Sequence, residues 1–345
     1  MIWLTWRQFR VQAFTAAAAL AAFAILLAAT GPHLASLYAA SGITGCHGGT
    51  CGVAASDFLS RLAVTGPYPI VYLLGIGLIL VAPAIVGIFW GAPLIARELE
   101  TRTFTLAWNQ SITRTRWLLV KLTLTGLAAM AVTEALSLIY AWWADPIGKA
   151  IGLLGLGDGS SSHPFEGQFS SVIFATHGIT PLGYAAFAFA LGTATGALIR
   201  RTVPAMAVTL AIFAAAQVAM PLGVRPHLIP SDRTIVTIES AGLDFGNLTA
   251  TVVPGQPGAW LISSSAINAA GQPVSDLPAA CQAAFSGLKP SSPGACLESH
   301  GFREVIAYEP ASRYWPLQGI ETGIFLALAL ALAGFCFWRL SRRRT

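Results

Sequence analysis

The segment IVYLLGIGLILVAPAIVGIFW, residues Ile70–Trp90, is a continuous apolar run that is long enough to cross a lipid bilayer as a helix. A hydrocarbon core about 30 Å thick needs about 20 apolar residues in helical form. The segment ARELETRTFTLAWNQSITRTRWLLVK, residues Ala96–Lys121, follows almost at once and concentrates Arg, Glu and Lys. A second apolar run begins inside it, at Trp117. This order predicts two membrane-spanning helices joined by a charged, helix-compatible segment.

The rest of the chain repeats the apolar pattern. Of its 345 residues, 55% are hydrophobic and only 10% are charged, whereas soluble domains carry about 25% charged residues. The mean hydropathy is +0.66. The runs are continuous rather than alternating, so they predict helices and not the strands of a barrel. We expect an all-α polytopic membrane protein with six transmembrane helices, near Val11–Thr30, Ile70–Trp90, Trp117–Trp143, Ile173–Ile199, Val203–Leu222 and Leu317–Trp338.

Basic residues set the expected orientation, because Lys and Arg are enriched in cytoplasmic loops. Six spans place both termini on one side, together with Ala96–Lys121 and the Arg200-Arg201 turn. That side collects most of the 20 basic residues, and its acids are Glu98 and Glu100. The sequence therefore predicts cytoplasmic termini in a multi-pass membrane protein. The pI near 9.1 then reflects a basic cytoplasmic face and does not argue for nucleic-acid binding.

The first ten residues are expected to form a short interfacial helix. They interleave Trp3, Trp6 and Phe9 with Arg7 and Arg10, which suits a helix lying in the headgroup layer. The apolar run that follows is longer than the core of a secretory signal peptide. We therefore expect this run to be retained as span one.

Three parts are expected along the chain. Residues 1–222 hold the interfacial helix, spans one to five and a charged helix near 94–116. Residues 223–313 form an extracytoplasmic insert, in which Thr234–Ile238 and Trp260–Ser264 have strand-like composition. Residues 314–345 form span six and a basic tail. We also expect Asp145–Phe169 to be an outer segment after span three.

The cysteines agree with this orientation. Cys46 and Cys51 fall in the first outer loop, and Cys281 and Cys296 fall in the last. Two close pairs on the oxidising side predict two local disulfides. The Cys46-His47 pattern is also compatible with a metal site, but it lacks a convincing fourth ligand, so we favour disulfides and expect no metal.

No sequence motif for catalysis is found. A P-loop requires G-x-x-x-x-G-K-[ST], and none of Lys121, Lys149 and Lys289 lies in that setting. The zinc-protease pattern H-E-x-x-H is also missing. We therefore expect no catalytic residues and no cofactor in this chain.

Two polar residues inside predicted spans are candidates for a substrate path. Glu134 lies near the middle of span three, where a carboxylate is costly unless it is protonated, paired or in contact with water. It could line a cavity for a cationic or polar substrate, or donate a hydrogen bond between helices as a protonated acid. Gln217 in span five and His177 near the outer end of span four are weaker candidates, and for each we favour a hydrogen bond between helices.

The charged segment between spans two and three is the main functional candidate. If residues Leu94–Leu106 are helical, their apolar side chains lie against the bilayer or the helix bundle, and a charged edge faces the cytoplasm. A solvated loop that only enforces topology is the alternative. The segment carries acids as well as bases and is longer than topology requires, so we favour a docking surface for a partner.

This segment resembles the cytoplasmic coupling region of type-2 ATP-binding-cassette exporter permeases, and actinobacterial members in particular. The resemblance rests on Arg97-Glu98-Leu99-Glu100, Thr103, Leu106-Ala107-Trp108, Arg114 and Lys121, and Tyr308–Trp315 also looks like that group. Arg102 departs from the pattern, since Gly is common there.

The resemblance implies a location in the bacterial cell membrane, a function and partners. Such permeases dimerise, and each copy binds a separate ATPase subunit that holds ATP and Mg²⁺. Carried over by position, Arg97, Glu98, Glu100 and Arg102 would couple this chain to its ATPase. Spans two and five would form the dimer seam and the substrate path. The expected function is ATP-driven export of an amphipathic drug, antibiotic, lipid or peptide. The alternatives are a membrane sensor or assembly scaffold with a ligand-binding outer domain, and an integral membrane enzyme using outer-loop His and Asp residues.

Overall fold

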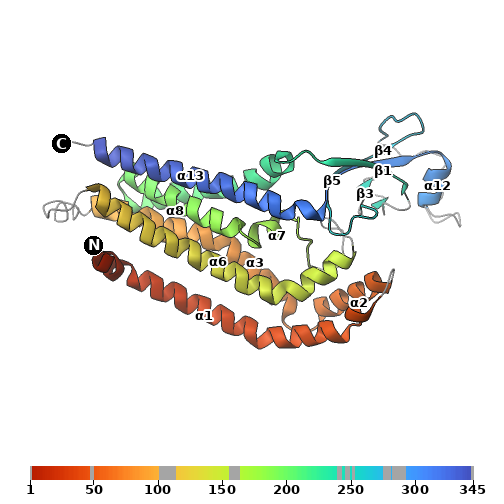
Figure 1. Cartoon of the computed structure of the whole chain (residues 1–345), viewed down its shortest axis with the longest axis horizontal. Coiled ribbons are helices and arrows are strands. Elements are labelled where there is room, and N and C mark those ends of the chain that lie inside the picture. The colour runs from red at the N-terminus through yellow and green to blue at the C-terminus, as the bar shows by residue number, and fades with distance from the viewer. Residues whose placement is uncertain are drawn as a thin grey trace.

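Long helices run side by side along an elongated molecule (Figure 1). This computed structural model describes residues 2–46, 50–100, 114–154, 164–238, 243–244, 249–250, 253–274, 281 and 293–342. Both termini lie at one end of the bundle, which we call the terminal end, and the β-strands lie at the opposite end, the insert end (Figure 1).

The helices are α1 (Ile2–Ala40), α2 (Thr50–Val64), α3 (Tyr68–Ile85), α4 (Ala92–Glu100), α6 (Arg114–Leu154), α7 (Ser171–Thr176), α8 (Thr180–Ile199), α9 (Thr202–Ala219), α12 (Pro293–Ser299) and α13 (Tyr314–Arg342). A π-helix at Val86–Gly91 joins α3 to α4, and a second, at Met220–Val224, extends α9. Short 3₁₀ turns cover Ile43–Gly45, Arg225–His227 and Ala311–Arg313.

Among the described residues, six helical segments are long and apolar enough to cross a membrane, which confirms the predicted class. They are Phe9–Ala40, Tyr68–Glu98, Arg116–Leu154, Thr180–Ile199, Thr202–His227 and Ala311–Arg339. The interfacial helix expected at residues 1–10 is helical from Ile2 onward, but it is continuous with span one.

Two helices extend beyond the predicted boundaries at the insert end. α1 continues through Pro32 to Ala40, and α6 continues through Pro146 to Leu154. Both helices bend toward this end (Figure 1), as expected where proline removes a backbone donor and crowds the preceding turn. The predicted outer loop Gly31–Pro69 therefore contains the end of α1 and the whole of α2, and Asp145–Leu154 is helix.

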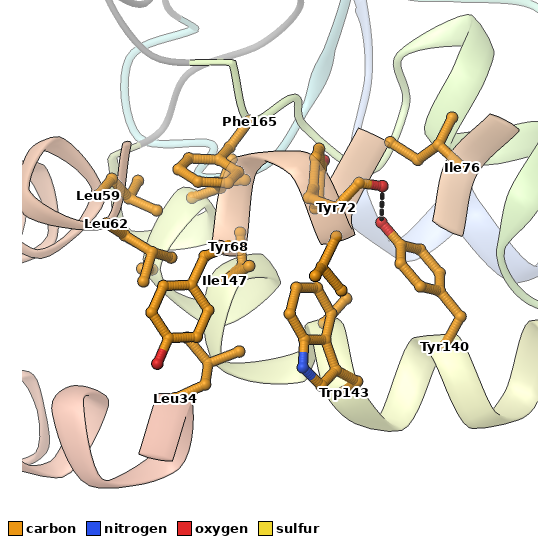
Figure 2. Packing of buried hydrophobic residues seen from close by; sticks show 14 of the residues in the cluster. Leu34, Leu59, Leu62, Tyr68, Tyr72, Ile76, Tyr140, Trp143, Ile147 and Phe165 are labelled. Carbon is orange, nitrogen blue, oxygen red and sulfur yellow. Dashed lines mark hydrogen bonds between the residues drawn. The ribbon is translucent and has the colours of Figure 1, made fainter. Parts of the chain in front are cut away.

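A core of aromatic and aliphatic residues fills the space between α1, α2, α3 and α6 at the insert end (Figure 2). The Tyr140 hydroxyl donates to the backbone oxygen of Tyr72 at 3.0 Å. The Trp143 Nε1–H donates to the Thr30 hydroxyl at 2.9 Å. Because buried Tyr and Trp need partners for their polar atoms, these bonds fix how α6 sits between α1 and α3.

Helix α8 is the centre of the bundle. Of its apolar window, 83% is buried, against 11% for α1 and 22% for α9. Its sequence, TPLGYAAFAFALGTATGALI, is rich in Ala and Gly, and small residues let helix backbones approach closely inside membranes. Contacts reach α8 from α3, α4, α6, α9 and α13.

The insert contains a three-stranded antiparallel sheet in the order β1-β5-β4, formed by Asp232–Val236, Arg303–Glu309 and Trp260–Ile267. A short ribbon pairs β2 (Leu243–Asp244) with β3 (Thr249–Ala250). The strand-like composition at 234–238 and 260–264 is confirmed, although β1 begins two residues earlier and β4 runs further. Strand β5 was not predicted, yet it is the central one. It lies immediately before span six.

Candidate functional site

Helix α4 leads from span two into the charged segment, and one face of it packs against α8. Ile95 and Ala96 are buried, whereas Arg97 is exposed. The contact is close because α8 presents glycine: a Cβ on Gly196 would lie 2.5 Å from the Ala92 carbonyl oxygen. That distance is shorter than any real Cβ contact, so α4 and α8 approach as closely as their backbones allow.

Glu98 connects α4 to span three. Its Oε1 accepts a hydrogen bond from the Nζ of Lys121, and these two groups form an ion pair. The Lys121 side chain is only 5% exposed, and its ammonium group lies 4.7 Å from the centre of the Trp117 ring. Because a buried ammonium is stable only when it is paired, Glu98 acts as the partner that Lys121 requires.

Glu100 connects α4 to span five. Its Oε2 accepts hydrogen bonds from the Thr202 backbone N–H at 3.2 Å and from the Thr202 hydroxyl at 2.8 Å. A carboxylate at a helix N-terminus satisfies an unpaired N–H and interacts favourably with the helix dipole. The Thr202 hydrogen bonds, with a smaller contribution from the charge of Arg201, lower the pKa of Glu100.

These contacts give different positions to three of the four predicted coupling residues. Glu98 and Glu100 face spans three and five, and Arg97 is exposed on the same short helix. Arg102 lies in residues 101–113, outside the described residues, as does most of the predicted helix near 94–116. The last turns of α4 therefore contact three other spans at the terminal end: α6, α8 and α9.

The π-helix before α4 adds a contact with span one that the sequence gave no reason to expect. A π-turn leaves a backbone carbonyl without its usual i+4 donor. The Phe89 oxygen accepts a hydrogen bond from the Gln12 side chain at 3.1 Å, and Phe9 packs edge-on against Trp90 at 4.8 Å. Span one is thereby joined to the segment that becomes α4.

Glu134 and Gln217 lie on helices that both pack against α8. The backbone N–H of Leu182, in the first turn of α8, is directed at the Glu134 carboxyl group. The Oε2 of Glu134 and the Nε2 of Gln217 are buried with no hydrogen-bond partner among the described residues, so these two atoms do not bond each other. Glu134 thus interacts with the first turn of α8, and the structure does not join Glu134 and Gln217 into one site.

A buried ion pair near the insert end was missed by sequence reasoning. Arg225 Nε and Nη2 contact the two carboxylate oxygens of Glu321 at 2.8 and 3.1 Å, and the side chains are 1% and 0% exposed. The Tyr184 hydroxyl donates to the same carboxylate, and the Arg225 guanidinium lies 4.1 Å above the Phe174 ring. This cluster joins spans four, five and six. The position of Glu321 inside predicted span six was the signal that could have revealed it.

Gln318 joins span six to a break in span four, between α7 and α8. Its Oε1 accepts from the backbone N–H groups of Ile179 and Thr180 at 3.0 and 3.1 Å. Its Nε2 donates to the carbonyl oxygens of Phe174 and His177, both at 3.0 Å. The Gln318 amide thus pairs with backbone N–H groups at the start of α8 and with carbonyl groups at the end of α7, which the two helices leave unpaired. The predicted continuous span at residues 173–199 is therefore two helices.

Both expected disulfides are present, joining Cys46 to Cys51 and Cys281 to Cys296. His300 lies close to the second, with its Nδ1 3.8 Å from the Cys281 sulfur. A metal would need thiolate sulfur, and here the sulfurs are bonded to each other.

Comparison with known families decides the class of the chain. A family model described as ABC-2 membrane transporter related matches residues 17–225. The chain belongs to this family. The match covers most of span one, all of spans two to four and nearly all of span five, and it ends at Arg225, before the sheet. No curated protein and no solved structure matches the chain.

Family membership makes the chain a permease component of an ABC transporter, and it confirms the predicted ABC-2 class. This multi-pass protein of the bacterial plasma membrane is the membrane component and not the ATPase. Membership also implies partnership with an ABC ATPase.

Proposed function

We propose that this permease is the membrane half of an ATP-driven exporter and that the segment around α4 docks on the ATPase subunit. The observation that carries this proposal is the set of contacts at the end of α4. This one helix is continuous with span two, pairs through Glu98 with span three, packs on Gly196 of span four and caps span five through Glu100. A force applied beyond Glu100 therefore reaches four spans at once.

In this mechanism the ATPase, which binds ATP and Mg²⁺, closes and displaces the segment that begins at α4. The displacement passes into the bundle because α4 and α8 are in backbone contact and packed interfaces do not deform continuously. Glu98 and Glu100 transmit it without touching the ATPase. Arg97, exposed on the same helix, is the residue of α4 that contacts the partner. The terminal end is the cytoplasmic end.

The exporter works as a dimer of this permease and expels an amphipathic substrate outward. The support lies in span five, where α9 is exposed along most of its length, with Val203, Leu210, Val218 and Leu222 all more than 40% exposed. Because other helices of the same chain cover little of span five, its exposed surface is suited to form the interface with a second copy of the permease. Gln217 and the Glu134 side chain are candidates for contact with the substrate.

A charge swap between Glu98 and Lys121 tests whether Glu98 transmits movement within the permease or docks directly on the ATPase. Glu98→Lys should abolish substrate-stimulated ATP hydrolysis in the reconstituted complex, because it places two ammonium groups together at a buried position. Adding Lys121→Glu restores the ion pair in the opposite sense, and we expect it to restore most of the stimulation. If Glu98 instead docked directly on the ATPase, the second substitution would restore nothing.

Arg97→Glu tests docking by itself. We expect it to weaken co-purification of the ATPase while the permease remains folded and inserted in the membrane. Asp57→Lys is the control, a charge reversal on α2, which lies at the insert end (Figure 1). The Asp57 side chain is 58% exposed and pairs with Arg61 of the same helix. If the ATPase still co-purifies normally with the Arg97→Glu permease and is stimulated normally by it, docking through α4 is refuted.

A further inference from the structure

A cavity of about 550 Å³ opens at the insert end, between α6, the α7–α8 break and the loop that precedes β4. Leu138, Ala141 and Ile151 line it from α6, Pro257 and Gly258 from the insert, and Trp315 from the start of span six. Its size falls within the range of small-molecule sites, which are mostly apolar with a few placed polar groups. None of the residues assigned to coupling lies in it.

The wall that closes this cavity toward the insert is firmly built. The backbone N–H of Glu166 donates to the Tyr72 hydroxyl at 3.2 Å, and Tyr72 packs edge-on against Phe165 at 5.0 Å. Figure 2 shows the Phe165 ring beside Tyr72 of α3. The Gln168 side chain donates to the Gly258 carbonyl at 3.3 Å, which attaches the wall to the insert loop. The site is therefore formed before any ligand enters.

Aromatic rings form the side of the cavity next to span six. Phe169 packs edge-on against Tyr314 at 5.6 Å, and Tyr314 against Trp315 at 5.5 Å. Phe169 also stacks on Trp260 of β4, with ring planes 9° apart. Trp315 is 62% exposed, so its indole is accessible from the cavity mouth. Exposed aromatic faces of this kind attract organic cations.

The charged side chains of the cavity favour a cation. Asp145, Lys149 and Glu166 line it. The Lys149 ammonium lies 2.7 Å from the Asp145 carboxylate, so these two charges neutralise each other. No basic side chain pairs with Glu166 among the ion pairs of the described residues. His177 also lines the cavity, and burial lowers its pKa, so it carries no charge. The formal charge of the described lining is therefore −1. The uncompensated charge is that of Glu166.

We propose that this cavity binds an amphipathic organic cation, whose apolar body lies against α6 and whose charge lies between Glu166 and the Trp315 ring. The site is accessible at the insert end and needs neither ATP nor the ATPase subunit. It is a property of the permease that does not depend on the proposed export mechanism.

A pair of probes of the same size and shape but opposite charge tests the proposal. Binding of tetraphenylphosphonium and of tetraphenylborate is measured on the full-length permease in dodecyl maltoside micelles, without ATPase. We expect saturable binding of the phosphonium only. Equal binding of both ions would show an apolar site without charge selection and would overturn the proposal, as would no saturable binding of either.

Two substitutions should move phosphonium affinity in opposite directions. Glu166→Gln removes the uncompensated charge and should weaken binding about fivefold, the effect of one partly solvated ion pair of about 1 kcal/mol. Lys149→Met leaves Asp145 unpaired, so the lining becomes more negative and binding should tighten. Asp57→Asn, the same charge change on a helix that does not line the cavity, should leave affinity unchanged. General loss of folding would weaken binding in every variant, so tightening by Lys149→Met distinguishes a charge effect from damage.

Trp315→Leu tests the aromatic contribution. It keeps an apolar side chain at the cavity mouth but removes the π-face, and it should weaken phosphonium binding about fivefold. Unchanged affinity in both Trp315→Leu and Glu166→Gln would overturn the proposed position of the ligand.

Discussion

Replacing Gln318 by leucine should destabilise the permease by about 4 kcal/mol, because this one amide joins span six to both ends of the break in span four. Its oxygen accepts from the backbone N–H groups of Ile179 and Thr180, and its nitrogen donates to the carbonyls of Phe174 and His177. Gln318→Leu keeps the volume of the side chain and removes every one of these bonds.

The magnitude follows from the groups left without partners. The two backbone N–H groups lose the only partner that the described residues give them. The Thr180 hydroxyl, which lies 2.9 Å from the Phe174 oxygen and 3.2 Å from the His177 oxygen, has one proton and can serve one carbonyl. Three buried or partly buried groups at about 2 kcal/mol each give about 6 kcal/mol. Burial of the leucine side chain returns about 2 kcal/mol, which leaves about 4 kcal/mol.

The assay combines unfolding of the purified permease in detergent with hydrogen exchange at residues 174–182. We expect a lower free energy of unfolding and faster exchange of the Ile179 and Thr180 amides. Gln318→Glu keeps an acceptor oxygen at the position of Oε1, to which both amides donate, and should protect those two amides better than Gln318→Leu does. Gln272→Leu, an exposed glutamine in the insert, is the control. A loss below about 1 kcal/mol with unchanged exchange would refute the reasoning.

Three further predictions concern the other contacts between spans. Glu321→Leu should destabilise the permease by about 3–5 kcal/mol because it leaves Arg225 buried and unpaired, and adding Arg225→Met should recover most of that loss in the same unfolding assay. Gly196→Val should separate α4 from α8 and reduce ATPase stimulation more than ATPase binding, measured by hydrolysis and co-purification; equal loss of both would contradict transmission through this contact. Thr202→Val should raise the pKa of Glu100 toward its ordinary value, as measured by a ¹³C NMR titration of that carboxyl group. Since the folded pKa is lowered, the contribution of Glu100 to stability is present above the unfolded pKa of about 4.5 and is lost as the pH falls through the folded value. The substitution should reduce this acid-sensitive contribution, because the backbone N–H of residue 202 still donates to Glu100.

The coupling assignment illustrates how structure changes the meaning of a sequence pattern. The sequence placed Glu98 and Glu100 on a charged edge next to Arg97, and all three were expected to face a partner. The structure instead directs Glu98 at the buried Lys121 and Glu100 at the first turn of span five. Nothing local distinguishes a carboxylate that faces solvent from one that pairs with a lysine 23 positions further along the chain.

The six spans could be predicted from the sequence because crossing a membrane is decided by the hydropathy of about 20 consecutive residues. The same reasoning predicted that both termini lie at one end (Figure 1), and the cysteine spacing predicted both disulfides. These features depend on composition and short separations, which a sequence states directly.

The tertiary structure alone decided which residues meet. It paired Arg225 with Glu321, placed Gln318 in the break of span four, and made β5 the central strand between two strands that precede it in the chain. Each of these pairings joins residues more than 35 positions apart. Their partners are set by how α8 packs at the centre of the bundle, since a buried polar group takes whichever partner the surrounding helices bring within reach.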